Sequence, residues 1–160
     1  MKRGSTLFLK VVIFLLALIV LAIMIKFPQT EGRAANLDLV SIYKDPFIIY
    51  AYLSSIPFFV ALFQAIKLLG FVEKNKIFTQ AAVKVVRTIK YCATLLIVLV
   101  AAPVGYLVTV MRGKSDDIAG GVASGVFLIF ASIVIATAAA VLQKLLQNAV
   151  DLKSENDLTV

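Results

Sequence analysis

Four long apolar runs, joined by short polar segments, constrain this chain more than any other feature. None of the runs has a charged residue near its middle, and they cover residues 8–25, 46–70, 91–111 and 119–143. A helix that crosses the hydrocarbon core of a bilayer needs about 20 apolar residues, and each run is long enough. The sequence therefore predicts an all-α integral membrane protein that crosses the bilayer four times.

The rest of the chain is too short for a second, soluble domain. The chain has 160 residues, of which 61% are hydrophobic, and a soluble domain of ordinary size takes about 100 residues. We expect one membrane domain over 1–160, a four-helix bundle with helices at about 6–26, 46–70, 80–111 and 119–153 and an acidic tail at 154–160. The first helix has no small-residue cleavage site at its end, so we expect it to remain as an anchor.

The basic residues fall mainly on one side of the predicted membrane. If the N-terminus is cytoplasmic, the inner segments carry a net charge of +7 and the outer segments carry none. The inner basic residues are Lys2, Arg3, Lys10, Lys67, Lys74, Lys76, Lys84, Arg87, Lys90, Lys144 and Lys153. The positive-inside rule then predicts that both termini are cytoplasmic. Anionic lipids at that face are sufficient to account for the charge, so we expect no direct nucleic-acid binding.

The residues available for chemistry are few. The chain has no histidine and a single cysteine, Cys92, and no Asp, Glu, Lys or Arg lies in the middle of a span. This excludes histidine-ligated metals and haem, Ser–His or Cys–His nucleophiles, and the buried charges that ion-coupled carriers usually need. We predict a non-enzymatic protein with no cofactor and no metal site.

A basic face precedes the third span. Thr79 is a good N-cap, so a helix should begin near residue 80 and continue into the membrane. Lys84, Arg87 and Lys90 then form a collar at the cytoplasmic surface, where anionic lipid contact is the simple interpretation. The alternative is a docking surface for an acidic segment, and the chain's own end supplies one in Asp151, Glu155, Asn156 and Asp157.

Small residues predict where two helices meet. Ala101 and Gly105 lie in the outer half of the third span, and Gly121 and Gly125 lie in the outer half of the fourth. Because a short loop joins these spans, we expect them to pack closely through these four residues, with homo-oligomerisation as the competing use of the motif. Kinks are expected at Pro57 and Pro103, and serines 54 and 55 can bond a carbonyl that Pro57 leaves free.

The first outer segment, residues 27–45, is ambiguous. Pro28 and Gly32 mark its start, while apolar residues recur at helical spacing further on. A short helix on the membrane surface and an irregular loop fit the pattern about equally well.

Two segments resemble a known family. Residues 77–84 (IFTQAAVK) with 87–90 (RTIK) are similar to the cytoplasmic signature of the bacterial domain of unknown function 2975, and residues 152–160 (LKSENDLTV) resemble that family's C-terminus closely. Val86 departs from the leucine often found there. The resemblance implies a small bacterial protein with four spans in the cell membrane and no assigned activity. Such proteins are often encoded beside a small helix-turn-helix DNA-binding protein.

Two functions follow as hypotheses. The first is a membrane protein that acts through a cytoplasmic partner, such as a small helix-turn-helix transcription regulator, bound at the collar and the tail. The alternative is a small oligomeric transporter or permeability factor for apolar or cationic compounds, working around the two proline kinks.

Overall fold

The computed structural model describes residues 3–30, 38–113 and 118–159. Within these ranges the chain forms five α-helices and no strand: α1 (Arg3–Thr30), α2 (Leu39–Tyr43), α3 (Pro46–Glu73), α4 (Gln80–Val110) and α5 (Ile118–Leu158). All but α2 are long and apolar enough to cross a membrane. The predicted all-α membrane fold is therefore confirmed, and the first outer segment does contain a short helix, α2.

Local capping sets two of the helix starts. The Asp45 side chain accepts a hydrogen bond from the backbone N–H of Phe47, which starts α3, and Pro46 occupies the first turn, where no N–H is needed. The Thr79 hydroxyl accepts from the N–H of Ala82 and starts α4, which confirms the predicted N-cap.

Two helices are longer than predicted. Helix α1 continues through Pro28 to Thr30, so this proline lies inside a helix and does not begin the loop. Helix α5 continues to Leu158, so most of the segment predicted as a separate tail is helical. The physical reason is that residues 151–157 contain no glycine or proline that would stop a helix once it has begun.

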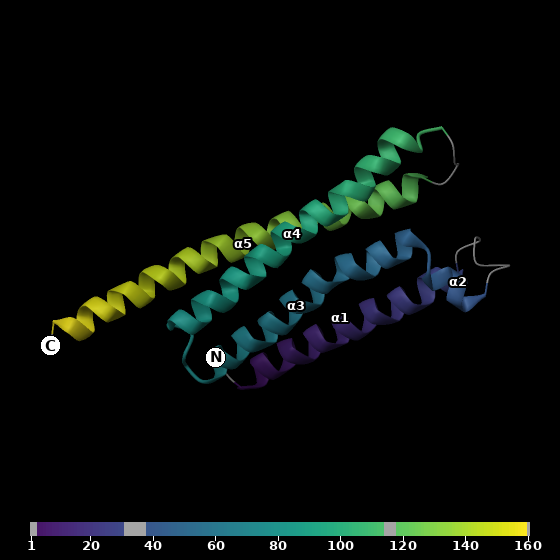
Figure 1. Cartoon of the computed structure of the whole chain (residues 1–160). Helices are drawn as coiled ribbons and strands as arrows, with labels where there is room; N and C mark the ends of the chain where they lie inside the picture. Colours follow the sequence, from purple (N-terminus) through teal and green to yellow (C-terminus); the bar gives the residue numbers. More distant parts are fainter. Residues whose placement is uncertain (1–2, 31–37, 114–117, 160) are drawn as a thin grey trace.

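The four long helices pack in chain order, each against the next (Figure 1). Helix α1 packs on α3, α3 packs on α4, and α4 packs on α5 over the greatest length. The helices therefore form a row, in which α1 and α5 are the two flanks. We call the end where α1 begins and α5 stops the basic end, and the opposite end the neutral end.

A seven-residue repeat holds α5 against α4. Its buried residues are Gly125, Ser132, Ala139 and Leu146, which lie on one side of the helix. A methyl group added at Gly125 would overlap the Val104 side chain, and one added at Gly121 would touch Leu107 at 3.4 Å. The small residues of α5 therefore receive larger side chains of α4.

The predicted packing set is consequently half wrong. Gly121 and Gly125 face α4, but Ala101 and Gly105 are exposed, and a methyl group added at Gly105 would meet open space. Val100 and Val104 face α5 in their place. Because residues 101 and 105 lie one position beyond these valines on the helix, they turn toward the lipid side.

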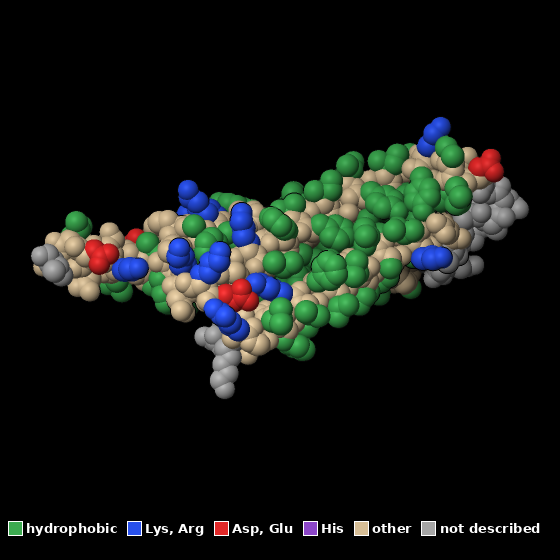
Figure 2. Space-filling view, turned by 90° about the horizontal axis from the view of Figure 1, so that it is seen from below, with side chains coloured by type: hydrophobic (Ala, Val, Ile, Leu, Met, Phe, Trp, Pro, Cys, Tyr) green, Lys and Arg blue, Asp and Glu red, His purple; other side chains and the backbone are tan. Residues whose placement is uncertain are grey.

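A cluster of buried apolar residues lies at the basic end. Val83 and Val86 of α4 pack with Ala139 and Leu146 of α5, and Leu68 of α3 covers the group. Elsewhere the helices expose apolar side chains along their length, which Figure 2 shows as a broad green surface between two charged ends. This is the surface that a bilayer would cover.

Tyrosine hydroxyls join the helices at the neutral end. In an α-helix the carbonyl of residue i accepts from the N–H of residue i+4, and a proline at that position has no N–H to give. Pro103 leaves the carbonyl of Leu99 free, and the Tyr50 hydroxyl donates to this oxygen at 2.7 Å. Pro28 leaves the carbonyl of Met24 free in the same way, and the Tyr52 hydroxyl donates to it at 2.8 Å.

Helix α3 is therefore fastened on both sides. Tyr50 and Tyr52 are two positions apart, so they leave α3 in different directions, one toward α4 and the other toward α1. The contact near Pro57 is different. This proline leaves the carbonyl of Leu53 free, but the Ser55 hydroxyl donates to the carbonyl of Tyr52, one residue earlier. Helices α3 and α4 are each continuous through Pro57 and Pro103, and the kinks stay a prediction.

Candidate functional site

The basic face of α4 stands clear of the other helices. Lys84 and Arg87 are exposed, while Val83 and Val86, their neighbours in sequence, are almost completely buried against α5. The buried valines fix the rotation of the helix, and this rotation turns the two cations away from the core. Lys84 and Arg87 therefore form an exposed basic face, and Lys90 beside them is half-buried.

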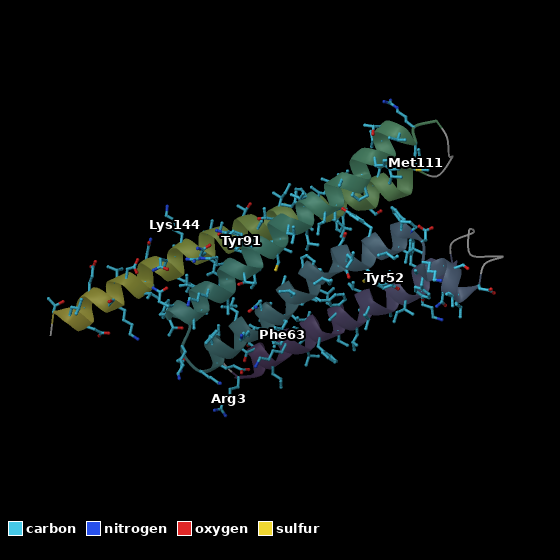
Figure 3. The ribbon with its side chains drawn as sticks, in the orientation of Figure 1. Arg3, Tyr52, Phe63, Tyr91, Met111 and Lys144 are labelled. Atoms are coloured by element: carbon cyan, nitrogen blue, oxygen red, sulfur yellow. The ribbon has the colours of Figure 1, made fainter. Side chains whose placement is uncertain are left out.

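Aromatic rings accompany two of the cations. The Lys90 ammonium lies 5.0 Å from the centre of the Tyr91 ring, and the Lys67 ammonium lies 6.0 Å from the centre of the Phe63 ring. Both rings are exposed, Tyr91 on α4 and Phe63 on α3, and both are labelled in Figure 3. Cation–ring pairs of this kind suit the boundary between hydrocarbon and water, where one part of a side chain is apolar and the other hydrated.

An ion pair ties the start of α1 to the end of α3. The Lys10 ammonium donates to the Glu73 carboxylate at 2.6 Å. This pair is the one salt bridge found among the described residues. This pairing was not predicted from the sequence. A signal was available in the sequence. Lys10 lies near the start of the first apolar run and Glu73 follows the end of the second, so both lie on the same predicted side of the membrane.

The end of α5 extends past the start of α4. Residues 151–159 are all exposed, and Leu158 keeps 85% of its surface accessible (Figure 1). Asp151 accepts a hydrogen bond from Gln147 of the same helix at 2.8 Å. Asp151 and Glu155, four residues apart, share one face of the helix, so their charges add.

The structure does not bring the acidic end of α5 onto the basic collar. Lys84, Arg87 and Lys90 form no ion pair with Asp151, Glu155 or Asp157 among the described residues. The reason is that the tail is helical and continues away from α4 instead of folding back. The two charged groups are thus separate surfaces at the same end of the molecule, and Asn156 lies between the acidic residues in sequence.

Two shallow recesses lie between the helices. One, of about 230 Å³, lies at the basic end and is lined by Leu68, Val86, Ile89, Ile135, Ala138, Ala139 and Leu142. The other, of about 130 Å³, lies beside Pro28 and Tyr52 at the neutral end. Their linings are almost wholly apolar, so neither offers a set of polar groups that could perform chemistry.

Comparison with known proteins places the chain. Residues 29–160 match the family model described as "Protein of unknown function (DUF2975)". The chain belongs to the DUF2975 family. A relative from Bacillus subtilis (strain 168), described as "Uncharacterized membrane protein YoaS", is 44% identical over 164 residues, a span that covers 100% of each chain. No solved structure matches.

Membership in DUF2975 agrees with the resemblance drawn from residues 77–90 and 152–160. The described residues of both segments lie at the basic end, around the start of α4 and at the end of α5. Sequence reasoning missed the hydrogen bonds that the hydroxyls of Tyr50 and Tyr52 make in this DUF2975 protein. Their signal was a proline in each neighbouring helix, because every such proline leaves one carbonyl without a donor.

Proposed function

We propose that this DUF2975 protein is a non-enzymatic membrane protein that binds a partner protein in the cytoplasm through its basic end. Both termini are cytoplasmic in this proposal, in line with the positive-inside rule. The partner surface consists of the basic face of α4, with Lys84, Arg87 and Lys90, and the acidic end of α5, with Asp151, Glu155 and Asp157.

The observation that carries the proposal is the exposed helical end of α5. About 12 Å of helix continues beyond Val150, at a rise of 1.5 Å per residue, with every side chain open to solvent. A short isolated helix is marginal in water, so a segment of this kind gains order when a second protein covers it. A small helix-turn-helix DNA-binding protein is the partner class that we favour.

Two charge signs at one end favour selective binding. A partner that presents a basic patch to α5 and an acidic patch to α4 would be oriented by both contacts, and the wrong orientation would place like charges together. Exposed ion pairs contribute about 0–1 kcal/mol each, so the complex would be reversible and sensitive to salt.

Affinity purification tests the proposal directly. The full chain and a version ending after Val150 would be purified from native membranes in mild detergent, and the co-purifying proteins identified by mass spectrometry. We expect a small soluble DNA-binding protein with the full chain, at least about tenfold depleted with the shortened one, which corresponds to about 1.4 kcal/mol of binding free energy.

A charge-reversed variant repeats the test, and a substitution at the neutral end provides the control. Asp151→Lys with Glu155→Lys should cause the same loss, while Asp38→Asn at the neutral end, which also removes an exposed acid, should leave capture unchanged. Capture that is equal with and without residues 151–160 would contradict the proposal.

Transport is a second candidate, supported by one observation in α3. The side-chain oxygens Oγ of Ser54 and Oε1 of Gln64 are buried and have no hydrogen-bond partner among the described residues. A polar atom without a partner in hydrocarbon is costly, and a passing solute or a neighbouring copy could satisfy it. Uptake of a cationic dye into liposomes that contain the purified protein, compared with Gln64→Leu, separates this candidate from partner binding.

A further inference from the structure

The end of α5 carries two apolar stripes, and only one of them faces α4. The α4-facing stripe includes Leu146 and Val150. The other stripe, which we call the second stripe, consists of Leu145, Ala149, Leu152 and Asn156, spaced by four, three and four residues. Leu145 and Leu152 keep 60% and 66% of their surface exposed. Nothing in the described part of the chain covers them.

The two stripes differ in charge beyond the level at which α4 begins. The α4-facing stripe becomes charged at Lys153 and Asp157, at the level where α4 is no longer present to cover it. The second stripe stays free of charge through Asn156. The charged residues Lys144, Asp151 and Glu155 also lie off it. A side of a solvated helix that excludes every nearby charge is typical of a helix–helix contact.

The membrane does not explain this stripe. Lys144 marks the end of the fourth apolar run, so Leu145 lies at the membrane boundary and Leu152 lies about 12 Å beyond Lys144, among charged residues. Burying a leucine side chain is among the larger favourable contributions that one residue can make to a protein contact. A partner that covers the second stripe would therefore gain most of its affinity there.

We propose that the second stripe pairs with the same stripe of a second copy of this chain, as a parallel two-stranded coiled coil. Copies in one membrane share one orientation, so their α5 helices are parallel before they meet. In heptad terms Leu145 and Leu152 occupy d positions, and Ala149 and Asn156 occupy a positions. Leucine at d with one asparagine at a is the pattern that specifies register and two strands in parallel coiled coils.

The stripe continues into the membrane, where the molecule offers a matching recess. Ile135, Ala138 and Leu142 extend the same spacing, and all three line the recess of about 230 Å³ at the basic end. Leu68 and Val86 form its other walls. A side chain from the second copy can enter this space, so the contact begins inside the bilayer and ends in the cytoplasm.

Tethering in the membrane compensates for the shortness of the cytoplasmic part. Residues 142–156 span only about two heptads, which would be too few for a stable pair in solution. The membrane confines the helices to two dimensions and one orientation, which raises their effective concentration. The pairing leaves Asp151 on the far side of the helix, open to the proposed partner, whereas Glu155 takes a g position that flanks the contact.

Disulfide trapping in a purified system tests the pairing. Cys92 is the free cysteine, so it is first changed by Cys92→Ser, and Leu152→Cys is added. The full chain is reconstituted in liposomes of phosphatidylcholine and phosphatidylglycerol and oxidised with copper phenanthroline. We expect most of the protein to migrate as a covalent dimer, because facing d positions bring two Cβ atoms within disulfide reach.

The matched control is Asp151→Cys, the preceding residue on the same helix, which should stay monomeric. Leu145→Cys, at the other d position, should cross-link like Leu152→Cys, so the test does not depend on one variant. Asn156→Leu should raise the dimer fraction and Leu152→Glu should abolish it.

Three outcomes would overturn the proposal. The first is equal cross-linking at positions 151 and 152. The second is no cross-linking at either d position in protein that circular dichroism shows to be helical. The third is that, when the same variants are oxidised in native membranes, they cross-link only to a different protein. Because the liposomes contain no other protein, failure here leaves the partner proposal untouched, and loss of the partner leaves the dimer intact.

Discussion

The two ends of this molecule are held together by different forces. At the neutral end, tyrosine hydroxyls from α3 reach the backbone carbonyls of α1 and α4 that prolines have left free. At the basic end, a small apolar cluster and a half-buried ion pair hold the helices. Between lipid-covered helices there is little hydrophobic driving force, whereas hydrogen bonds and close packing remain effective.

The difference follows the solvent at each position. The Leu99 carbonyl lies inside the third apolar run, where lipid offers no donor, and the Met24 carbonyl lies near the outer end of the first run. The basic-end cluster includes Val83 and Leu146, which lie outside the predicted spans, so ordinary hydrophobic burial acts there. Stability should therefore depend on apolar burial at the basic end and on hydrogen bonds at the neutral end. Four substitutions test this, in order of the expected loss of stability.

The largest loss is expected from Leu146→Ala at the basic end. Leu146 is 4% exposed within the apolar cluster, and removing a buried leucine leaves a cavity that costs about 2–5 kcal/mol. The measurement is the free energy of unfolding in mixed micelles titrated with sodium dodecyl sulfate. Leu158→Ala, at a position 85% exposed, should have no effect. Equal losses at the two positions would show that the cluster does not stabilise this end.

Overpacking at Gly125 is expected to come next. Gly125→Leu would force the added side chain into Val104, and overpacking a close contact costs about 1–3 kcal/mol. Gly105→Leu is the matched control on the partner helix, because a side chain there enters open space. The same unfolding titration measures both variants. If Gly105→Leu were the more damaging, the packing first predicted from the sequence would be right and the seven-residue seam wrong.

These packing residues show where sequence reasoning ends. The spans, the Thr79 cap and the chain's family could be predicted, because each depends on local composition or a short motif. The rotation of each helix could not, since an apolar helix in lipid exposes the same residue types that it buries, and Ala101 and Gly105 met the small-residue rule as well as Gly121 and Gly125 did. The spacing of Gly125, Ser132, Ala139 and Leu146 contained the missing information.

The site was less predictable than the fold for a related reason. The collar was found because a charge pattern on a capped helix determines its own exposed face. The relation of the collar to the tail was not found, since it depends on whether residues 151–158 continue α5 or fold back. Helix propensity alone favoured continuation, and attraction between opposite charges favoured folding back. The structure follows the first.

A smaller loss is expected at the neutral end from Tyr50→Phe. It removes the donor for the Leu99 carbonyl, and one hydrogen bond between membrane helices is worth about 0.6–1.7 kcal/mol. Pro103→Ala should rescue this variant, because residue 103 then supplies its own N–H to Leu99. Tyr106→Phe, at an exposed tyrosine that forms no side-chain hydrogen bond with the described residues, is the control. Additive losses in the double variant would mean that proline and tyrosine act independently.

The smallest effect should come from Glu73→Gln, which breaks the ion pair with Lys10. Both side chains keep more than a quarter of their surface accessible, at 27% and 28%, so water and salt screen the attraction. We expect a fall in Tm smaller than that of Tyr50→Phe at low salt, and no difference from the parent chain at high salt. Tyr50→Phe should keep its full effect at high salt, because a neutral hydrogen bond away from water is not screened. A Glu73→Gln effect that persists in salt would mean that the pair is desolvated by neighbours of α1 and α3, and that polar contacts, rather than the apolar cluster, hold both ends.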